Sequence, residues 1–187
     1  MELKNICKGF DGKTVLHDVS IEIKHGETVL ITGTSGRGKT TLLRIMMGLT
    51  SPDSGELLNT CKSIAAVFQE DRLPSEFTPY ACVKMTAPRG ISKETILGHL
   101  AEVGLADSAN KPVSQLSGGM RRRVAIVRAV VCNADTVFFD EPFTGLDRDT
   151  KLKTIEYIKR HTQGKTLVFI SHDAEDETLL DARKIRI

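Results

Sequence analysis

No apolar run in this sequence approaches the roughly 20 residues that a membrane-spanning helix needs. The first residues also lack an apolar segment of signal-peptide length. We therefore expect a protein that reaches a membrane only through a partner. Internal repeats and low-complexity tracts are absent as well, and 187 residues predict one domain that is large enough to bury a core.

Neither sign of charge is in excess, because 26 basic and 24 acidic residues are interspersed and leave a net charge of +2. Charge therefore gives no argument for a nucleic-acid partner. The four cysteines lie far apart and include no C-x-x-C pair. This pattern predicts a reduced intracellular chain whose thiols are partly buried.

What the sequence does contain is a glycine-rich loop between an apolar strand, 29–31, and a helix that begins near Thr41. Residues Gly33–Thr40 match G-x-x-x-x-G-K-[ST], the phosphate-binding loop of nucleotide triphosphatases. Glycines let successive backbone N–H groups point at anionic oxygens, and the helix N-terminus adds to that field. We expect Lys39 to reach the β- and γ-phosphates and the Thr40 hydroxyl to bind Mg²⁺.

Strand-like and helix-like segments alternate along most of the chain, which predicts an α/β fold with a mostly parallel sheet. Two half-exposed strands near the start are joined by a turn at Asp11-Gly12, and residues 51–55 give a strong turn signal. The expected strands are 2–7, 19–23, 29–31, 64–68, 136–139, 166–170 and 184–187. Besides the helix after the loop and a short one after Asp173, the expected helices are 79–86, 92–103, 117–131 and 148–161.

The segment from about 73 to 113 has a different character. Prolines punctuate its short helical patterns, and no strand run is visible. We therefore expect a helical insertion that is carried on the main sheet.

Two acidic residues, Asp140 and Glu141, follow the buried strand 136–139. Ligands bind at the carboxyl ends of the strands in open α/β sheets. We expect Asp140 to hold Mg²⁺, directly or through water, and Glu141 to orient or deprotonate the attacking water. Alone, the pair is equally well explained as the polar end of a strand, and the phosphate-binding loop favours the catalytic interpretation.

Two further polar residues are expected at the same edge of the sheet. His172 follows strand 166–170, where its imidazole can hydrogen-bond the γ-phosphate or the water. Gln69 ends strand 64–68, and its amide can reach Mg²⁺ and the water. Each signal is weak by itself, and the other four histidines are expected to be structural or solvated.

The stretch Leu116–Met120 predicts a second anion site, because Ser117-Gly118-Gly119 opens a helix with free backbone N–H groups. One chain that binds one triphosphate has no use for a second such site. Two head-to-tail chains would have a use for it, since each offers its helix start to the nucleotide of the other. The alternative is an ordinary serine N-cap.

Together these residues resemble the nucleotide-binding subunit of ABC transporters over essentially the whole chain, 2–187. The corresponding motifs are Walker A at Gly33–Thr40, the Q-loop at Gln69, the signature at Leu116–Met120, Walker B with its glutamate at Val137–Glu141, the D-loop at Gly145–Asp147 and the H-loop at Ser171–Asp173. The resemblance implies a single P-loop NTPase domain, 1–187. In it a RecA-like core with an antiparallel β subdomain (1–72 and 114–187) carries a helical subdomain (about 73–113).

The resemblance also implies a set of site residues and the ligands ATP and Mg²⁺. Its catalytic residues are Lys39, Gln69, Glu141 and His172, and its metal ligands are Thr40, Gln69 and Asp140. Phe10 lies where the family has an aromatic ring that stacks on adenine. The residues expected to bind nucleotide are Phe10, Val15, Gly33, Thr34, Ser35, Gly36, Arg37, Gly38, Lys39, Thr40, Thr41, Ser117, Gly118, Gly119, Met120 and Asp147.

The family mechanism implies partners. Two subunits, as a homodimer or a heterodimer, sandwich two ATP and two Mg²⁺, and nucleotide completes the closure. The helical insertion would receive a coupling helix from a membrane permease. The expected location is the cytoplasmic face of the membrane, with an extracytoplasmic solute-binding protein as a further partner and no nucleic acid.

A finer resemblance is to the nitrate, sulfonate and taurine importers. It rests on Phe68–Leu73 and on the signature, where Met120 replaces the common Gln and three arginines follow. The segment 72–79 departs from the usual importer loop and leaves the permease open. The chain stops soon after His172, which leads us to expect no C-terminal regulatory domain.

Two alternatives remain from other classes. The first is a soluble ABC ATPase that acts on ribosomes or DNA, although such proteins usually carry two cassettes or a long coiled coil. The second is a switch that no longer hydrolyses nucleotide. The intact Lys39, Asp140, Glu141 and His172 argue against it.

Overall fold

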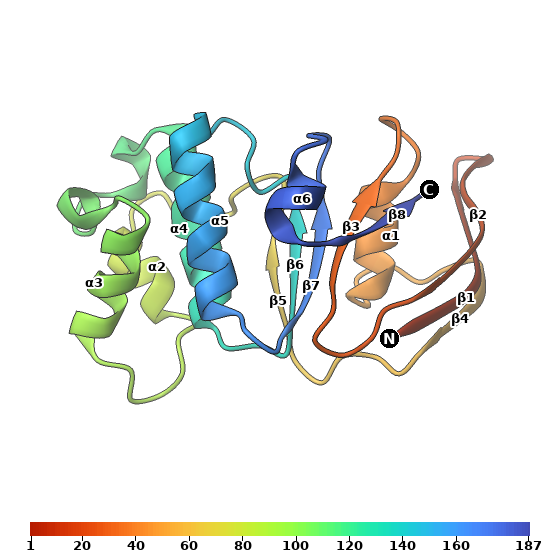
Figure 1. The fold of residues 1–187 in the computed structure, drawn as a ribbon, viewed down its shortest axis with the longest axis horizontal. Coiled ribbons are helices and arrows are strands. Elements are labelled where there is room, and N and C mark those ends of the chain that lie inside the picture. Colours follow the sequence, from red (N-terminus) through yellow and green to blue (C-terminus); the bar gives the residue numbers. More distant parts are fainter.

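The structure is a computed structural model that describes residues 1–187. Its centre is a sheet of five parallel strands in the order β5-β6-β7-β3-β8 (Figure 1). These strands are β3 (Thr28–Thr32), β5 (Ile64–Val67), β6 (Thr136–Asp140), β7 (Thr166–Ile170) and β8 (Arg183–Arg186). Every residue of β6 and β7 is buried, as expected of a parallel sheet that is covered on both faces.

A second sheet is antiparallel and has the order β2-β1-β4. Its strands are β1 (Glu2–Phe10), β2 (Lys13–Glu22) and β4 (Ser54–Leu58). The predicted turn at Asp11-Gly12 is confirmed, but the second strand is longer than 19–23. The turn predicted over 51–55 is partly wrong, because Ser54 already begins β4 and Leu57 pairs with Leu3.

Six α-helices complete the fold. They are α1 (Lys39–Met46), α2 (Pro79–Lys84), α3 (Lys93–Glu102), α4 (Gly118–Val131), α5 (Arg148–His161) and α6 (Asp176–Leu180). Short 3₁₀ turns lie at Ala106–Ser108 and Val113–Gln115. No strand occurs in 73–113, as predicted, and α2 and α3 end earlier than the predicted 79–86 and 92–103. None of the helices combines the length and the apolar character of a bilayer span.

The core has two parts, one on each face of the parallel sheet. On one face, Phe139 and Phe169 pack with α4, α5 and the helical insertion, and their rings stack with centroids 4.4 Å apart. On the other face, Phe138 and Val168 pack with α1 and the antiparallel sheet. The helical insertion therefore shares its core with the sheet through α4, and the antiparallel sheet lies at the other end of the molecule (Figure 1).

The stacked rings of Phe139 and Phe169 lead to a prediction about the stability of the fold. We expect Phe169→Ala to lower the free energy of unfolding by about 3–5 kcal/mol, because it leaves a cavity between fully buried neighbours. Phe169→Leu keeps most of the volume and should cost less than about 1.5 kcal/mol. Urea unfolding monitored by circular dichroism measures both, and equal losses would contradict this packing.

Candidate nucleotide-binding site

The phosphate-binding loop lies tightly against the start of β2. Gly38 has φ = +86°, and a Cβ atom there would lie 2.7 Å from Val15 Cγ1 and 2.8 Å from Leu16 Cδ2. A side chain is excluded by both the backbone conformation and the close approach. Glycine at this position lets the chain turn directly from the loop into α1, whose first residue is Lys39.

The Lys39 side chain is folded over the loop that precedes it. Its residue is only 6% exposed, and the Nζ donates to the carbonyl oxygens of Gly33 at 2.8 Å and Thr34 at 3.2 Å. The ammonium is therefore held against the loop by two of its carbonyl oxygens. Phosphate oxygens that enter the loop meet a positioned charge.

The carboxyl ends of four parallel strands meet beside this loop and form a cleft of about 270 Å³. Its lining residues are Val15, Ser35, Gly36, Gly38, Lys39, Thr40, Thr41, Gln69, Asp140, Glu141, Ile170 and His172. All except Ile170 are among the predicted site residues. Ile170 was missed because the last apolar residue of a buried strand gives only a structural signal.

Asp140 ends β6 at the floor of this cleft and is 2% exposed. Burial raises the pKa of its carboxyl group, and a hydrogen bond from Thr40 is the largest opposing influence. A divalent cation would offset this burial of charge. The donors present, a hydroxyl at Thr40, an amide at Gln69 and the carboxylate, are the oxygen ligands that Mg²⁺ prefers, so the residues fit this ion.

Glu141 and His172 form a pair across the cleft, with His172 Nε2 2.9 Å from Glu141 Oε1. Burial raises the pKa of Glu141, and the charge of His172 lowers it. Glu141 is also one of the few non-glycine residues with a positive φ, 52°, and its N–H donates to the Ile170 carbonyl at 3.0 Å. A carboxylate held in an uncommon backbone conformation at a cleft is typical of a functional residue.

The loop that carries His172 is tied down by a buried polar cluster. The Ser171 hydroxyl donates to the carboxylate of Asp176, which is completely buried, and accepts from the Asp173 N–H at 3.1 Å. Lys151 from α5 pairs with both Asp173 and Asp176 at 2.5 Å. These contacts fix the backbone on each side of His172 and leave its side chain half exposed.

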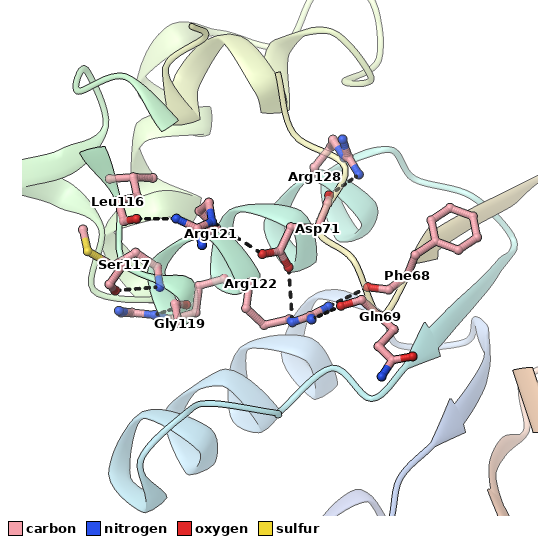
Figure 2. Close-up of polar contacts among 11 residues, drawn as sticks. Phe68, Gln69, Asp71, Leu116, Ser117, Gly119, Arg121, Arg122 and Arg128 are labelled. Atoms are coloured by element: carbon pink, nitrogen blue, oxygen red, sulfur yellow. Dashed lines mark hydrogen bonds and ion pairs between the residues drawn. The ribbon is translucent and has the colours of Figure 1, made fainter. Parts of the chain in front are cut away.

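The residues of the signature segment, Leu116–Met120, do not face this cleft. Ser117 caps α4, where its Oγ accepts from the Met120 N–H at 3.3 Å, as Figure 2 shows for the start of the helix. A second cleft, here called the signature cleft, is lined by Asp71, Ser117, Gly118, Gly119, Arg122, Arg123, Thr144, Gly145, Leu146, Asp147 and Thr150. One chain therefore carries two separate clefts, and the two predicted anion sites lie in different ones.

Sequence reasoning missed Asp71 and Arg122 in the signature cleft. A signal existed for Arg122, because Ile126 and Ala129 follow it at helical spacing and place it on the buried stripe of α4. A charged residue on such a stripe is uncommon and predicts a specific partner. Asp71, in a loop, gave no periodic signal.

The remaining predicted nucleotide ligands lie outside the first cleft. Phe10 is 48% exposed at the end of β1, with Lys8 Nζ 5.3 Å from its ring centroid. Arg37 lines a neighbouring groove with Val15, and the Met120 side chain packs against the core. Their contacts with nucleotide stay predictions.

Fold and cleft together define a phosphate-binding-loop nucleotide triphosphatase. The family model described as ABC transporter matches residues 16–144. The chain therefore belongs to the ABC transporter family, and the predicted family and fold class are confirmed.

Relatives of known kind agree. Over 98% of its length the chain is 35% identical to the aliphatic sulfonates import ATP-binding protein SsuB 2 of Pseudomonas syringae pv. tomato, of which it spans 80%. It is 33% identical to the spermidine/putrescine import ATP-binding protein PotA of Mycoplasma capricolum subsp. capricolum, of which it spans only 57%. The dimeric, post-hydrolysis structure of the ATP-binding cassette MJ0796 with ADP and Pi matches with a TM-score of 0.85 and 29% identity, over 100% of this chain and 93% of that one.

The Glu141–His172 pair predicts the acid limb of the activity profile. Because burial raises the pKa of Glu141, a larger fraction is protonated at a given acidic pH, so activity should fall with a midpoint above the ordinary 4.5. His172→Ala removes the influence that lowers this pKa, so the midpoint of its residual activity should move to higher pH. The profile of kcat against pH measures both, with His25→Ala as control. A midpoint that stays or moves lower in His172→Ala would contradict the pairing.

Proposed function

We propose that this chain is the ATP-hydrolysing subunit of an ABC transporter and works as a nucleotide-closed dimer. The single observation that carries the proposal is the separation of the two clefts. Lys39, Asp140 and Glu141 line one, and Ser117–Gly119 line the other. Each cleft supplies one half of an anion site. Pairing two chains head to tail brings together the two halves of each site.

The residues of the first cleft divide the chemistry among them. Loop N–H groups and Lys39 bind the phosphates. Thr40, Gln69 and Asp140 would hold Mg²⁺, which would neutralise phosphate charge. Glu141 accepts the hydrogen bond of the attacking water and takes its proton. His172, 2.9 Å from Glu141, favours the ionised carboxylate, and its imidazole would hydrogen-bond the γ-phosphate.

The second chain supplies the opposite wall. Ser117 and the N–H groups at the start of α4 would contact the γ-phosphate that is bound by the first chain. Asp147 lines the same cleft and caps α5, with Thr150 N–H 2.9 Å from its Oδ1. The solved relative that retains ADP and Pi is itself dimeric, which supports this arrangement.

The relatives and the helical insertion support the proposed permease partner. Relatives named as import proteins support a permease partner, an import direction and a place on the cytoplasmic face of the membrane. Their solutes, sulfonates and polyamines, differ in charge, so the similarity specifies no solute. Phe77 and Met85 are exposed apolar residues of the insertion, 42% and 64%, and suit the contact with a permease helix. An extracytoplasmic solute-binding protein would deliver the solute.

Removing the ammonium in the phosphate-binding loop tests nucleotide binding. We expect Lys39→Ala to weaken ATP binding about tenfold to hundredfold and to abolish hydrolysis, because charge-assisted hydrogen bonds to phosphate are lost. Equilibrium dialysis and phosphate release measure the two effects. Lys153→Ala, an exposed lysine of α5, is the control. Native hydrolysis in Lys39→Ala would contradict the assignment of this loop as the phosphate-binding loop.

Blocking hydrolysis tests the dimer. We expect Glu141→Gln to bind ATP with native affinity and to accumulate as a dimer only when nucleotide is present, because closure precedes the water attack. Light scattering coupled to size exclusion, with and without MgATP, measures the mass. A Glu141→Gln protein that stays monomeric at saturating MgATP would count against the proposed function.

A second substitution in the Glu141→Gln background shows which surface the partner uses. Adding Ser117→Arg should prevent the dimer and leave ATP affinity of the monomer within about twofold, because the serine lies outside the phosphate-binding cleft. If Ser117→Arg instead lowers monomer affinity, the signature segment acts within one chain.

A further inference from the structure

One buried arginine of α4, Arg122, contacts a single loop, residues 68–71, through all of its guanidinium nitrogens (Figure 2). Arg122 is 7% exposed. Its Nη1 donates to the Phe68 carbonyl at 2.6 Å, its Nη2 donates to the Gln69 carbonyl, and its Nε lies 3.3 Å from Asp71 Oδ1. The planar guanidinium therefore fixes the backbone that follows the edge strand β5.

Both connected segments end in a functional surface. Gln69, whose carbonyl Arg122 holds, lines the phosphate-binding cleft. Ser117, five residues before Arg122 on the same helix, lines the signature cleft, and so do Arg122 and Asp71. The guanidinium thus joins the backbone of one cleft to the helix of the other.

Among the contacts of this guanidinium, the one with Asp71 has the least complete hydrogen bonding. Asp71 Oδ1 and Arg122 Nε are both buried and form no hydrogen bond of regular geometry, although their charges are in contact. Burial raises the pKa of Asp71, against the lowering influence of Arg122, Arg121 and Arg128. A buried charge contact with incomplete hydrogen bonding is costly in a low-dielectric interior, so its energy is sensitive to any shift of the loop.

We propose that Arg122 is a positioning residue that transmits the state of Gln69 to the signature segment of the same chain. The inference rests on the proposed dimer, because the signature segment then serves the nucleotide of the partner. Nucleotide contact at Gln69 shifts residues 68–71, the guanidinium moves α4 with them, and Ser117 is placed for the second site. Arg122 lies outside the phosphate-binding cleft of its own chain, so we expect its effect on the coupling of the two sites rather than on ATP binding in that cleft.

Steady-state hydrolysis against ATP concentration tests this coupling. In the native protein we expect a Hill coefficient above about 1.5, and in Arg122→Gln a coefficient of about 1 with kcat lowered about tenfold. ATP affinity of the monomer should stay within about twofold, because Arg122 is outside the phosphate-binding cleft. A purely structural role predicts the opposite pattern, a lower Tm and weaker binding with cooperativity retained.

Arg128 provides a matched control on the same helix. It donates to the carbonyls of Asp71 at 3.4 Å and Arg72 at 3.1 Å, so Arg128→Gln also removes a partly buried guanidinium from this loop. It donates no hydrogen bond to the carbonyl of Phe68 or Gln69. We expect Arg128→Gln to keep the Hill coefficient and to change kcat less than about twofold. Equal losses of cooperativity in both variants would overturn the specific role of Arg122.

A double-mutant cycle with Gln69→Ala tests the route. If Arg122 acts through Gln69, Arg122→Gln lowers kcat about tenfold in the native background and less than about twofold in the Gln69→Ala background. Losses that multiply across the two substitutions would overturn the proposal. Asp71→Asn keeps the shape and removes the charge, so it serves as the test variant if Arg122→Gln does not fold, with a smaller loss of cooperativity in the same direction.

The outcomes separate this inference from the proposed function. ATP-dependent dimerisation of Glu141→Gln, with native cooperativity in Arg122→Gln, overturns the inference alone. Absence of that dimer overturns the proposed function. A native protein that dimerises and hydrolyses ATP with a Hill coefficient of 1 has no coupling to transmit, and also overturns the inference.

Discussion

The parallel register of the central sheet is the constraint on which the site depends. Because β6 lies between β5 and β7, and β3 pairs with β7, four strands end at the same edge of the sheet. The chain leaving each strand must turn there, and the residues of those turns form the cleft. The phosphate-binding loop, Gln69, Glu141 and His172 come from four distant parts of the sequence and share that edge for this reason alone. Slipping one strand by a residue would reverse its two faces and remove its contribution to both cores.

The same burial that stabilises the sheet prepares the charges at its edge. Burial raises the pKa of both Asp140 and Glu141, so each carboxylate is charged at a cost that ligands or neighbours can offset. Two basic side chains oppose this negative charge. Lys39 is held by loop carbonyls, and His172 lies beside Glu141. A site of this kind favours a bound complex of anion and cation over either one alone.

The elements that the sequence predicted well are those with a strong local cause. Glycines and Lys39 form a motif that is specific for a phosphate-binding loop. The apolar runs of β6 and β7 are stable only where both faces of the sheet are covered. The misses arise where tertiary pairing outweighs local propensity. Ser54 and Gly55 carry turn chemistry yet begin β4, because Leu57 packs beside Leu3 once β1 is in place. The order of motifs could indicate that Ser117 serves another chain, but only the structure shows it in a separate cleft.

Arg122 shows the remaining limit of local reasoning and its physical reason. Arg122 and its two arginine neighbours in sequence are all compatible with a solvated helix face, and the burial of Arg122 depends on where β5 ends. Arg121 donates to Leu116 and Arg123 to Val103, so each of the three arginines holds a different backbone segment around the start of α4. A helix start held in this way is linked mechanically to the loops it contacts. In the proposed coupling, a displacement of residues 68–71 on nucleotide contact would be shared with the signature segment, and the two nucleotide sites of the proposed dimer would be linked.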